Sequence, residues 1–196
     1  LLVAGTTLAF TGCGTTSQQN TQTAQAIASW SETFDGATTN FSVSAPPTHA
    51  VSMSQATTEM MLQLGLADKM AGTAFKEEEI YEPLQGEYDK VKVLAEKWPS
   101  YEVFMSVKPD FATGWPDSFS KRAIPADKMI ANKVNIWLPE SMLSTKADLE
   151  TNFKDMIMLG KIFGVESKAN EWVKAQRDTL TKVQNQLKDV PRKRVF

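Results

Sequence analysis

The sequence of 196 residues contains one cysteine and one histidine, and these two scarcities exclude much chemistry at the outset. Cys13 has no partner for an intramolecular disulfide. A zinc or manganese site usually needs several Cys, His or clustered carboxylate ligands, so we predict no metal site built from side chains. A Cys/His nucleophilic pair would have to use Cys13 and His49, and neither Gly-x-Ser-x-Gly nor a P-loop is present. We therefore predict no catalytic residue and no cofactor.

Positive charge is also too scattered to indicate a polyanionic partner. The chain has 21 Lys and Arg against 23 Asp and Glu, which gives a formal net charge of −2. No basic block could neutralise a run of phosphates, so nucleic acid is excluded as an expected partner. Hydrophobic residues make up 42% and charged residues 22% of the chain, an ordinary composition for a globular protein.

The apolar run at the start of the chain is too short to span a bilayer. Residues 1–10 are small or apolar and lead into Thr11-Gly12-Cys13, which is typical of a signal-peptide core followed by a bacterial lipobox. Phe10 departs from the aliphatic residue usual there, and the alternative is a signal peptide with a chance cysteine. Residues 14–25 lack charge and bulky apolar side chains, which favours a flexible tether. We expect lipid attachment at Cys13 and an extracytoplasmic location, with contact to the cell membrane only through the lipid.

Strand-like and helix-like segments alternate from residue 50 onward, after a short hairpin with Asp35-Gly36 at its turn. Ser54 is a suitable N-cap for the first helix, Gly65 a suitable stop, and Thr145-x-x-Asp148 resembles a capping box. The alternation predicts an α/β fold with a mostly parallel sheet flanked by helices. The expected strands are 50–53, 70–74, 92–94, 111–113 and 134–138, and the expected helices are 54–66, 99–107, 126–131 and 145–164.

Residues 166–189 contain no glycine or proline and place their apolar residues along one stripe. The pattern predicts a single helix roughly 35 Å long, about the diameter of a small domain. A coiled-coil strand is the alternative, but the repeat is too short to sustain one. We interpret this helix as a strut that leads from one lobe to a second, and residues 190–196 as the start of a strand in that second lobe.

Several segments, in order and spacing, carry a resemblance to a known family. They are Val51 to Glu59, Leu64 to Ala74, Pro99-Ser100-Tyr101-Glu102 with Lys108 to Phe111, and the Lys-Arg-Val-Phe that follows the long helix. Over roughly residues 48–196 the chain resembles the substrate-binding lipoproteins of iron–siderophore and cobalamin ABC importers, the class III periplasmic binding proteins.

The resemblance implies two α/β lobes joined by one rigid helix, with the ligand held in the cleft between them. This chain would hold one Rossmann-like lobe and the interlobe helix. The expected division is a signal-peptide remnant with lipobox at 1–13, a tether at 14–29, the N-terminal ligand-binding lobe at 30–165, the interlobe helix at 166–189 and the start of a truncated second lobe at 190–196.

Loops that follow the strands of such a sheet line its ligand cleft. Trp98 and Trp115 stand beside polar or proline residues, so burial in the core is not their automatic explanation. The resemblance implies that Trp115 lines the pocket, whereas Trp98 is evenly balanced between pocket and core. Trp137 and Trp172 lie in apolar patterns and are expected to pack. The expected ligand-binding residues are Ser54, Gln55, Phe75, Lys97, Trp98, Trp115, Ser118 and Phe119.

Charged residues receive two kinds of expected role. Lys97, Lys121 and Arg122 could offset the negative charge of a ferric chelate, although plain surface charge is favoured for each one. The resemblance implies that Glu102 docks onto arginines of the permease, and a carboxylate there also complements a helix N-terminus. Glu59 is a weaker candidate for the same docking surface.

We therefore expect the extracytoplasmic substrate-binding component of an ABC importer, not an enzyme, which captures an iron–siderophore complex and delivers it to the membrane permease. Cobalamin or haem are alternative ligands in the same family, but Gly72 to Phe75 and Leu94-Ala95-Glu96 resemble the siderophore members more than the cobalamin members. A chelatase-like enzyme would need a nucleophile or base constellation that the sequence lacks. A surface adhesion lipoprotein would not need an aromatic cleft.

Overall fold

A computed structural model describes residues 25–191, and its centre is a five-stranded sheet in which every paired neighbour is parallel. The strand order is β5-β4-β3-β6-β7. The chain therefore winds outward from β3 to one edge and then returns to build the other half, as an α/β fold does. The strands are β3 (Ala50–Ser52), β4 (Met70–Ala74), β5 (Val93–Ala95), β6 (Phe111–Thr113) and β7 (Asn135–Trp137).

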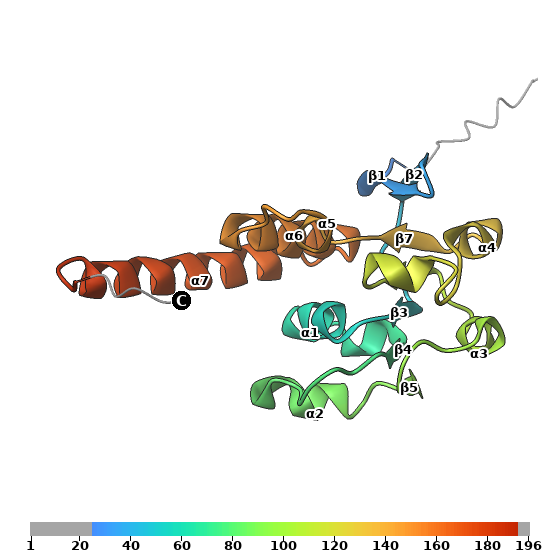
Figure 1. Cartoon of the computed structure of the whole chain (residues 1–196), viewed down its shortest axis with the longest axis horizontal. Coiled ribbons are helices and arrows are strands. Elements are labelled where there is room, and N and C mark those ends of the chain that lie inside the picture. Colours follow the sequence, from blue (N-terminus) through green and yellow to red (C-terminus); the bar gives the residue numbers. More distant parts are fainter. Residues whose placement is uncertain (1–24, 192–196) are drawn as a thin grey trace, which may run out of the picture.

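Helices cover both faces of the sheet. Figure 1 shows α1 and α2 on one side and α3 and α4 on the other. The helices are α1 (Gln55–Gln63), α2 (Gln85–Tyr88), α3 (Tyr101–Ser106), α4 (Ala126–Ala131), α5 (Glu140–Leu143), α6 (Leu149–Ile162) and α7 (Glu166–Leu187), with short 3-10 turns η1 (Ala67–Lys69), η2 (Glu82–Leu84) and η3 (Pro116–Phe119).

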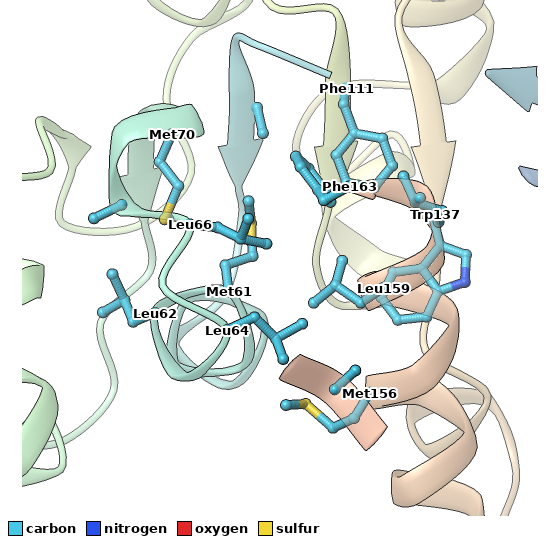
Figure 2. Packing of buried hydrophobic residues seen from close by; sticks show 14 of the residues in the cluster. Met61, Leu62, Leu64, Leu66, Met70, Phe111, Trp137, Met156, Leu159 and Phe163 are labelled. Carbon is cyan, nitrogen blue, oxygen red and sulfur yellow. The ribbon is translucent and has the colours of Figure 1, made fainter. Parts of the chain in front are cut away.

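Alternate residues of each strand serve two separate hydrophobic clusters, because successive side chains of a strand point to opposite faces. Ala50 and Phe111 belong to the cluster under α1 and α6. Figure 2 shows this side, where Phe111 lies beside Phe163 with ring centroids 5.2 Å apart. Val51 and Ala112 belong to the cluster under α3 and α4. The predicted mostly parallel sheet between helices is confirmed.

A hairpin of β1 (Ala28–Phe34) and β2 (Ala37–Val43) lies against the edge strand β7. Its turn is Asp35-Gly36, as predicted, and both residues have positive φ. The hairpin side chains satisfy backbone groups of the edge: Trp30 Nε1 donates to the Ile136 carbonyl at 2.7 Å, and the Glu32 carboxylate accepts from Leu138 N–H at 2.9 Å. A sheet edge covered in this way cannot pair with another chain.

The helix ends follow their capping residues, with one correction. Ser54 caps α1 and Gly65 follows it with φ 70°, as predicted. The predicted capping box at Thr145-x-x-Asp148 is wrong by three residues. Asp148 is itself the N-cap of α6, and it exchanges hydrogen bonds with Thr151. Thr145 lies three residues before Asp148 and Thr151 three residues after it, so the local sequence permits both registers.

The long helix α7 begins at Glu166, as predicted, and extends well past the sheet (Figure 1). Its first turns pack tightly on α6, where a Cβ on Gly160 would lie 2.5 Å from the Ala169 Cβ. Only Ala169 and Val173 of α7 are buried, and Val183 and Leu187 are exposed. The predicted apolar stripe is therefore covered in its first half only.

The predicted division of the chain stays a prediction, and its limit between Ser29 and Trp30 falls inside a strand. β1 begins at Ala28, two residues inside the predicted tether, and Ala28 is buried. Cys13 and the lipobox, most of the tether, and residues 192–196 lie outside the described residues. Within residues 25–191, no helix is both long and apolar enough to cross a membrane.

Candidate ligand-binding site

Three aromatic side chains meet at the carboxyl edge of the sheet. Phe75 follows β4, Trp98 follows β5 and Trp115 follows β6. Because these strands are parallel, their carboxyl ends meet at one edge, and the loops after them are brought together. They enclose a pocket of about 420 Å³, and its lining residues are Phe75, Glu77, Trp98, Trp115, Pro116 and Asp117.

The geometry of the aromatic side chains is fixed by packing and hydrogen bonds. The rings of Phe75 and Trp98 are stacked, with centroids 4.8 Å apart and an interplanar angle of 22°. Trp98 Nε1 donates to the Met53 carbonyl at 3.2 Å, and Trp115 Nε1 donates to the Glu77 carboxylate at 3.3 Å. All three rings are partly exposed. The pocket therefore presents flat apolar surface whose polar N–H groups are already satisfied.

Phe75 has a strained backbone, with φ of 60°. The left-handed region is costly for a bulky residue, and such strain persists only where the surroundings impose it. The Phe75 carbonyl accepts a hydrogen bond from Gln55 N–H at 3.1 Å, which anchors this conformation to the start of α1. In this conformation the phenyl ring stacks on Trp98 at the pocket.

Gln55 organises the loop beside the pocket. Its Oε1 accepts hydrogen bonds from Glu77 N–H and Glu78 N–H, and its Nε2 donates to Glu59 and to the Glu79 carbonyl. Because both the oxygen and the nitrogen of the Gln55 amide make hydrogen bonds, this side chain holds the loop that carries Glu77 in place. Gln55 itself is not among the residues that line the pocket.

Ser54, Ser118 and Phe119 lie behind the pocket surface. Ser54 is fully buried and caps α1, and Ser118 is fully buried with its hydroxyl donating to the Met53 carbonyl at 3.2 Å. Phe119 is buried in the cluster under α3 and α4. Met53 thus accepts from both Ser118 and Trp98, so that buried polar contacts hold two pocket loops together.

Charges at the pocket are dominated by carboxylates. Glu77 and Asp117 line it, and Arg122 is paired with Asp117 at 2.6 Å. Lys97 lies in an adjoining pocket of about 680 Å³ that shares Phe75 and Glu77 with the first. From the sequence, Lys97, Lys121 and Arg122 were candidates to offset the charge of a ligand. The structure instead places the acidic side chains of Glu77 and Asp117 beside the aromatic rings.

Glu102 is exposed in the first turn of α3 and is not part of either pocket. Its pKa is lowered, because its own backbone N–H and the Ser100 hydroxyl donate to the carboxylate and Lys128 lies nearby. The side chain is therefore a solvent-facing anion. This is the placement expected for a residue on the outer surface of the lobe.

Glu59 lies elsewhere, in a larger cavity of about 770 Å³ between α1, α5, α6 and α7. It accepts hydrogen bonds from Gln55 Nε2 and Tyr81 N–H. The other walls include Met60, Met156 and Trp172. The η2 segment also contributes to its walls, and size alone does not make this cavity the better ligand site.

Two buried carboxylates were not anticipated from the sequence. Glu32 accepts from Leu138 N–H, and Asp155 accepts from Glu140 N–H and Ser141 N–H at 2.8 and 2.9 Å. Burial raises the pKa of Glu32 to about 7 and also raises the pKa of Asp155. Together they hold the loop that follows β7. Nothing in the sequence distinguishes these acids from surface ones.

No cluster of three or more His, Cys, Asp or Glu suited to a metal ion occurs within residues 25–191. The hydrogen bonds of the pocket are used to fix its walls, and the partly exposed surface that remains is aromatic and acidic. Such an arrangement can bind a planar or bulky ligand by contact and by charge.

Known proteins are similar to this chain in sequence and in fold. A periplasmic binding protein from Veillonella parvula is 80% identical, with a TM-score of 0.86, over 88% of this chain and 58% of that one. Over most of its own length, the chain is therefore similar to a periplasmic binding protein. It is also 25% identical, over 97% of its length and 58% of the relative's, to the uncharacterized ABC transporter substrate-binding lipoprotein YvrC of Bacillus subtilis. No family model matches the chain.

A more distant solved structure has the same fold. The ABC-type ferric hydroxamate transport system from Saccharomonospora viridis is 19% identical, with a TM-score of 0.63, and this chain covers 56% of it. The chain thus spans a little under three fifths of the relatives that it matches. The predicted resemblance and the predicted fold class are confirmed.

Proposed function

We propose that this protein is the extracytoplasmic substrate-binding component of an ABC importer and that it captures an iron–siderophore complex. The observation that carries the proposal is the aromatic pocket of Phe75, Trp98 and Trp115 at the carboxyl edge of the parallel sheet. Similarity to proteins named as periplasmic binding protein and as substrate-binding lipoprotein supports the transport role. A protein of this kind binds and releases its ligand without changing it.

A ferric chelate suits the aromatic pocket in size and shape. Chelating groups wrapped around one iron give a bulky, rigid ligand with flat and apolar faces, and these can lie against aromatic rings at little entropic cost. The pocket of about 420 Å³ and the adjoining one of about 680 Å³ share Phe75 and Glu77, so one ligand can span both. The ligand supplies the metal together with its chelator, and the pocket needs no metal ligands of its own.

The protein would meet two further partners. Glu102, an exposed anion, is proposed to dock onto arginines of the permease, in agreement with its place outside both pockets. A lipid on Cys13 is proposed to hold the protein at the cell membrane. The long helix α7, with Val183 and Leu187 exposed, is proposed to join this lobe to a second lobe that closes over the ligand.

Uptake measurements test the proposal. Cells that lack this protein should accumulate radiolabelled iron from a ferric siderophore poorly, and the wild-type gene should restore accumulation. The same cells should take up cobalamin and haem normally. Loss of cobalamin or haem uptake with normal siderophore uptake would show that the ligand is different, although the transport role would stand.

A further inference from the structure

The aromatic pocket is acidic on the side that this lobe provides. Its six lining residues include Glu77 and Asp117 but no lysine or arginine. Glu77 is held against the rings, because Trp115 Nε1 donates to its carboxylate. Negative charge is thus placed at the N–H edge of the Trp115 ring, within a pocket lined by aromatic residues.

The nearest cations are balanced by carboxylates. Arg122 pairs with Asp117 at 2.6 Å, and Lys76 lies 3.7 Å from Glu79. The adjoining pocket is lined by two lysines, Lys76 and Lys97, and by two glutamates, Glu77 and Glu96. The wall therefore has no surplus of positive charge with which to attract a strongly anionic chelate.

We propose that this wall selects the charge of the ligand, and that it receives a cationic face, such as an ammonium group carried by a ferric chelate. The proposal rests on the proposed function and narrows its substrate class. An ammonium over the faces of Trp98, Trp115 or Phe75 is attracted by the ring quadrupoles. Glu77 adds a fixed anion beside those faces, and a chelate of several negative charges is repelled by both.

Three ferric chelates separate the effects of charge and shape. The first is a linear trihydroxamate with a pendant ammonium group, whose iron complex is cationic. The second is a cyclic trihydroxamate, whose complex is uncharged. The third is a tris-catecholate, whose complex carries three negative charges. Calorimetry on the wild-type protein should give the tightest binding for the cationic complex and the weakest for the anionic one.

The variant Glu77→Gln tests the fixed anion, because glutamine can still accept the hydrogen bond from Trp115. The affinity for the cationic complex should fall about two- to fivefold, with the uncharged complex unaffected. Added salt should weaken the cationic complex in the wild-type protein and have less effect in the variant. Glu82→Gln, an exposed acid outside both pockets, is the matched control and should change neither affinity.

Asp117→Asn gives the opposite test, because it releases Arg122 from its ion pair. Affinity for the tris-catecholate complex should rise in this variant. Tightest binding of the tris-catecholate complex to the wild-type protein would overturn the charge preference while leaving the proposed function intact. Failure of all three complexes to bind would overturn both.

Discussion

Glu32 is buried behind the edge strand, with only 6% of its surface exposed, and its pKa is raised from 4.5 to about 7. Removal from water is the main cause, and the negative charge of Asp155 adds to it, whereas the hydrogen bond from Leu138 N–H acts in the opposite direction. Because of the raised pKa, the stability of the folded protein around the loop after β7 depends on pH. The folded protein binds this proton more tightly than the unfolded chain does.

The stability of the protein should therefore fall as pH rises from about 4.5 to about 7. In this interval the folded state holds more protons than the unfolded state, so each added unit of pH favours unfolding. The shift corresponds to at most about 3 kcal/mol for Glu32. Urea unfolding between pH 4.5 and 8 measures this loss.

Glu32→Gln should flatten the pH dependence, because glutamine keeps an acceptor for Leu138 N–H and carries no proton to release. Some slope should persist, since the pKa of Asp155 is also raised. Glu150→Gln, at an exposed acid on α6, should leave the slope as it is. A variant slope equal to that of the wild type would show that Glu32 is not the group responsible.

Phe75 offers a test of the backbone strain at the pocket. Phe75→Gly and Phe75→Ala both remove the ring that stacks on Trp98, but only glycine adopts φ of 60° without a steric cost. The glycine variant should therefore be about 1 kcal/mol more stable than the alanine variant in urea unfolding. Equal stabilities would mean that the strain is relieved in some other way.

Whether a tryptophan lies in the core or at the surface could be predicted from whether its neighbours in the sequence are apolar. Trp115, between a glycine and a proline, lines the aromatic pocket, and its role in ligand binding stays a prediction. Trp137, inside an apolar strand, was expected to pack and is buried. The burial of Glu32 and Asp155 could not be predicted, because acidic residues are usually exposed and both are buried by segments distant in the sequence. The ligand-binding roles of all eight residues expected from the sequence stay predictions.

At the scale of elements, the contact between α6 and α7 depends on one small residue. Gly160→Ala would place a Cβ 2.5 Å from the Ala169 Cβ, and the two helices would have to move apart. We expect a loss of about 1 to 3 kcal/mol in the free energy of unfolding. Circular dichroism during urea denaturation measures it.

Gly86→Ala in α2 is the matched control, because a Cβ there meets no atom within 4 Å. This substitution should leave stability unchanged or raise it by up to about 1 kcal/mol, owing to the better helix propensity of alanine. Similar losses in both variants would argue against a close α6–α7 contact.

Elements with strong local signals were predicted with correct type and nearly correct limits. The strands β4 and β6 and the helix α4 have the expected bounds, and α7 begins at the expected residue. The short helices α2 and α5 were missed, because each has only four residues and too little periodicity to be recognised. Their formation depends on packing, and in α5 on the hydrogen bonds that Asp155 accepts from its first N–H groups.

At the scale of the whole molecule, a substitution at Glu102 should affect docking onto the permease without affecting ligand binding. It is exposed and lies outside both pockets, so Glu102→Arg should leave the affinity for the ferric siderophore nearly unchanged. Transporter-dependent uptake should be strongly reduced, since a rim charge mainly governs encounter and orientation. Affinity by calorimetry and uptake by radiolabelled iron should be measured on the same variant.

Glu82→Arg, at another exposed acid outside both pockets, serves as the control for a reversal of charge. Normal uptake by the Glu102 variant would remove this residue from the docking surface, and a large loss of affinity would place it at the ligand.

The fold of the lobe could be predicted from the sequence because alternating strands and helices specify it. The charge of the pocket could not be predicted, because it depends on which loops the sheet brings together.

Calorimetric titration of the purified protein with a ferric trihydroxamate tests most directly whether the aromatic pocket captures a ferric chelate. The wild-type protein should bind the iron complex, and Trp115→Leu should weaken binding about tenfold or more. Trp172→Phe, in the larger cavity, should bind as the wild type does. An absence of binding, or an equal loss in both variants, would contradict the account.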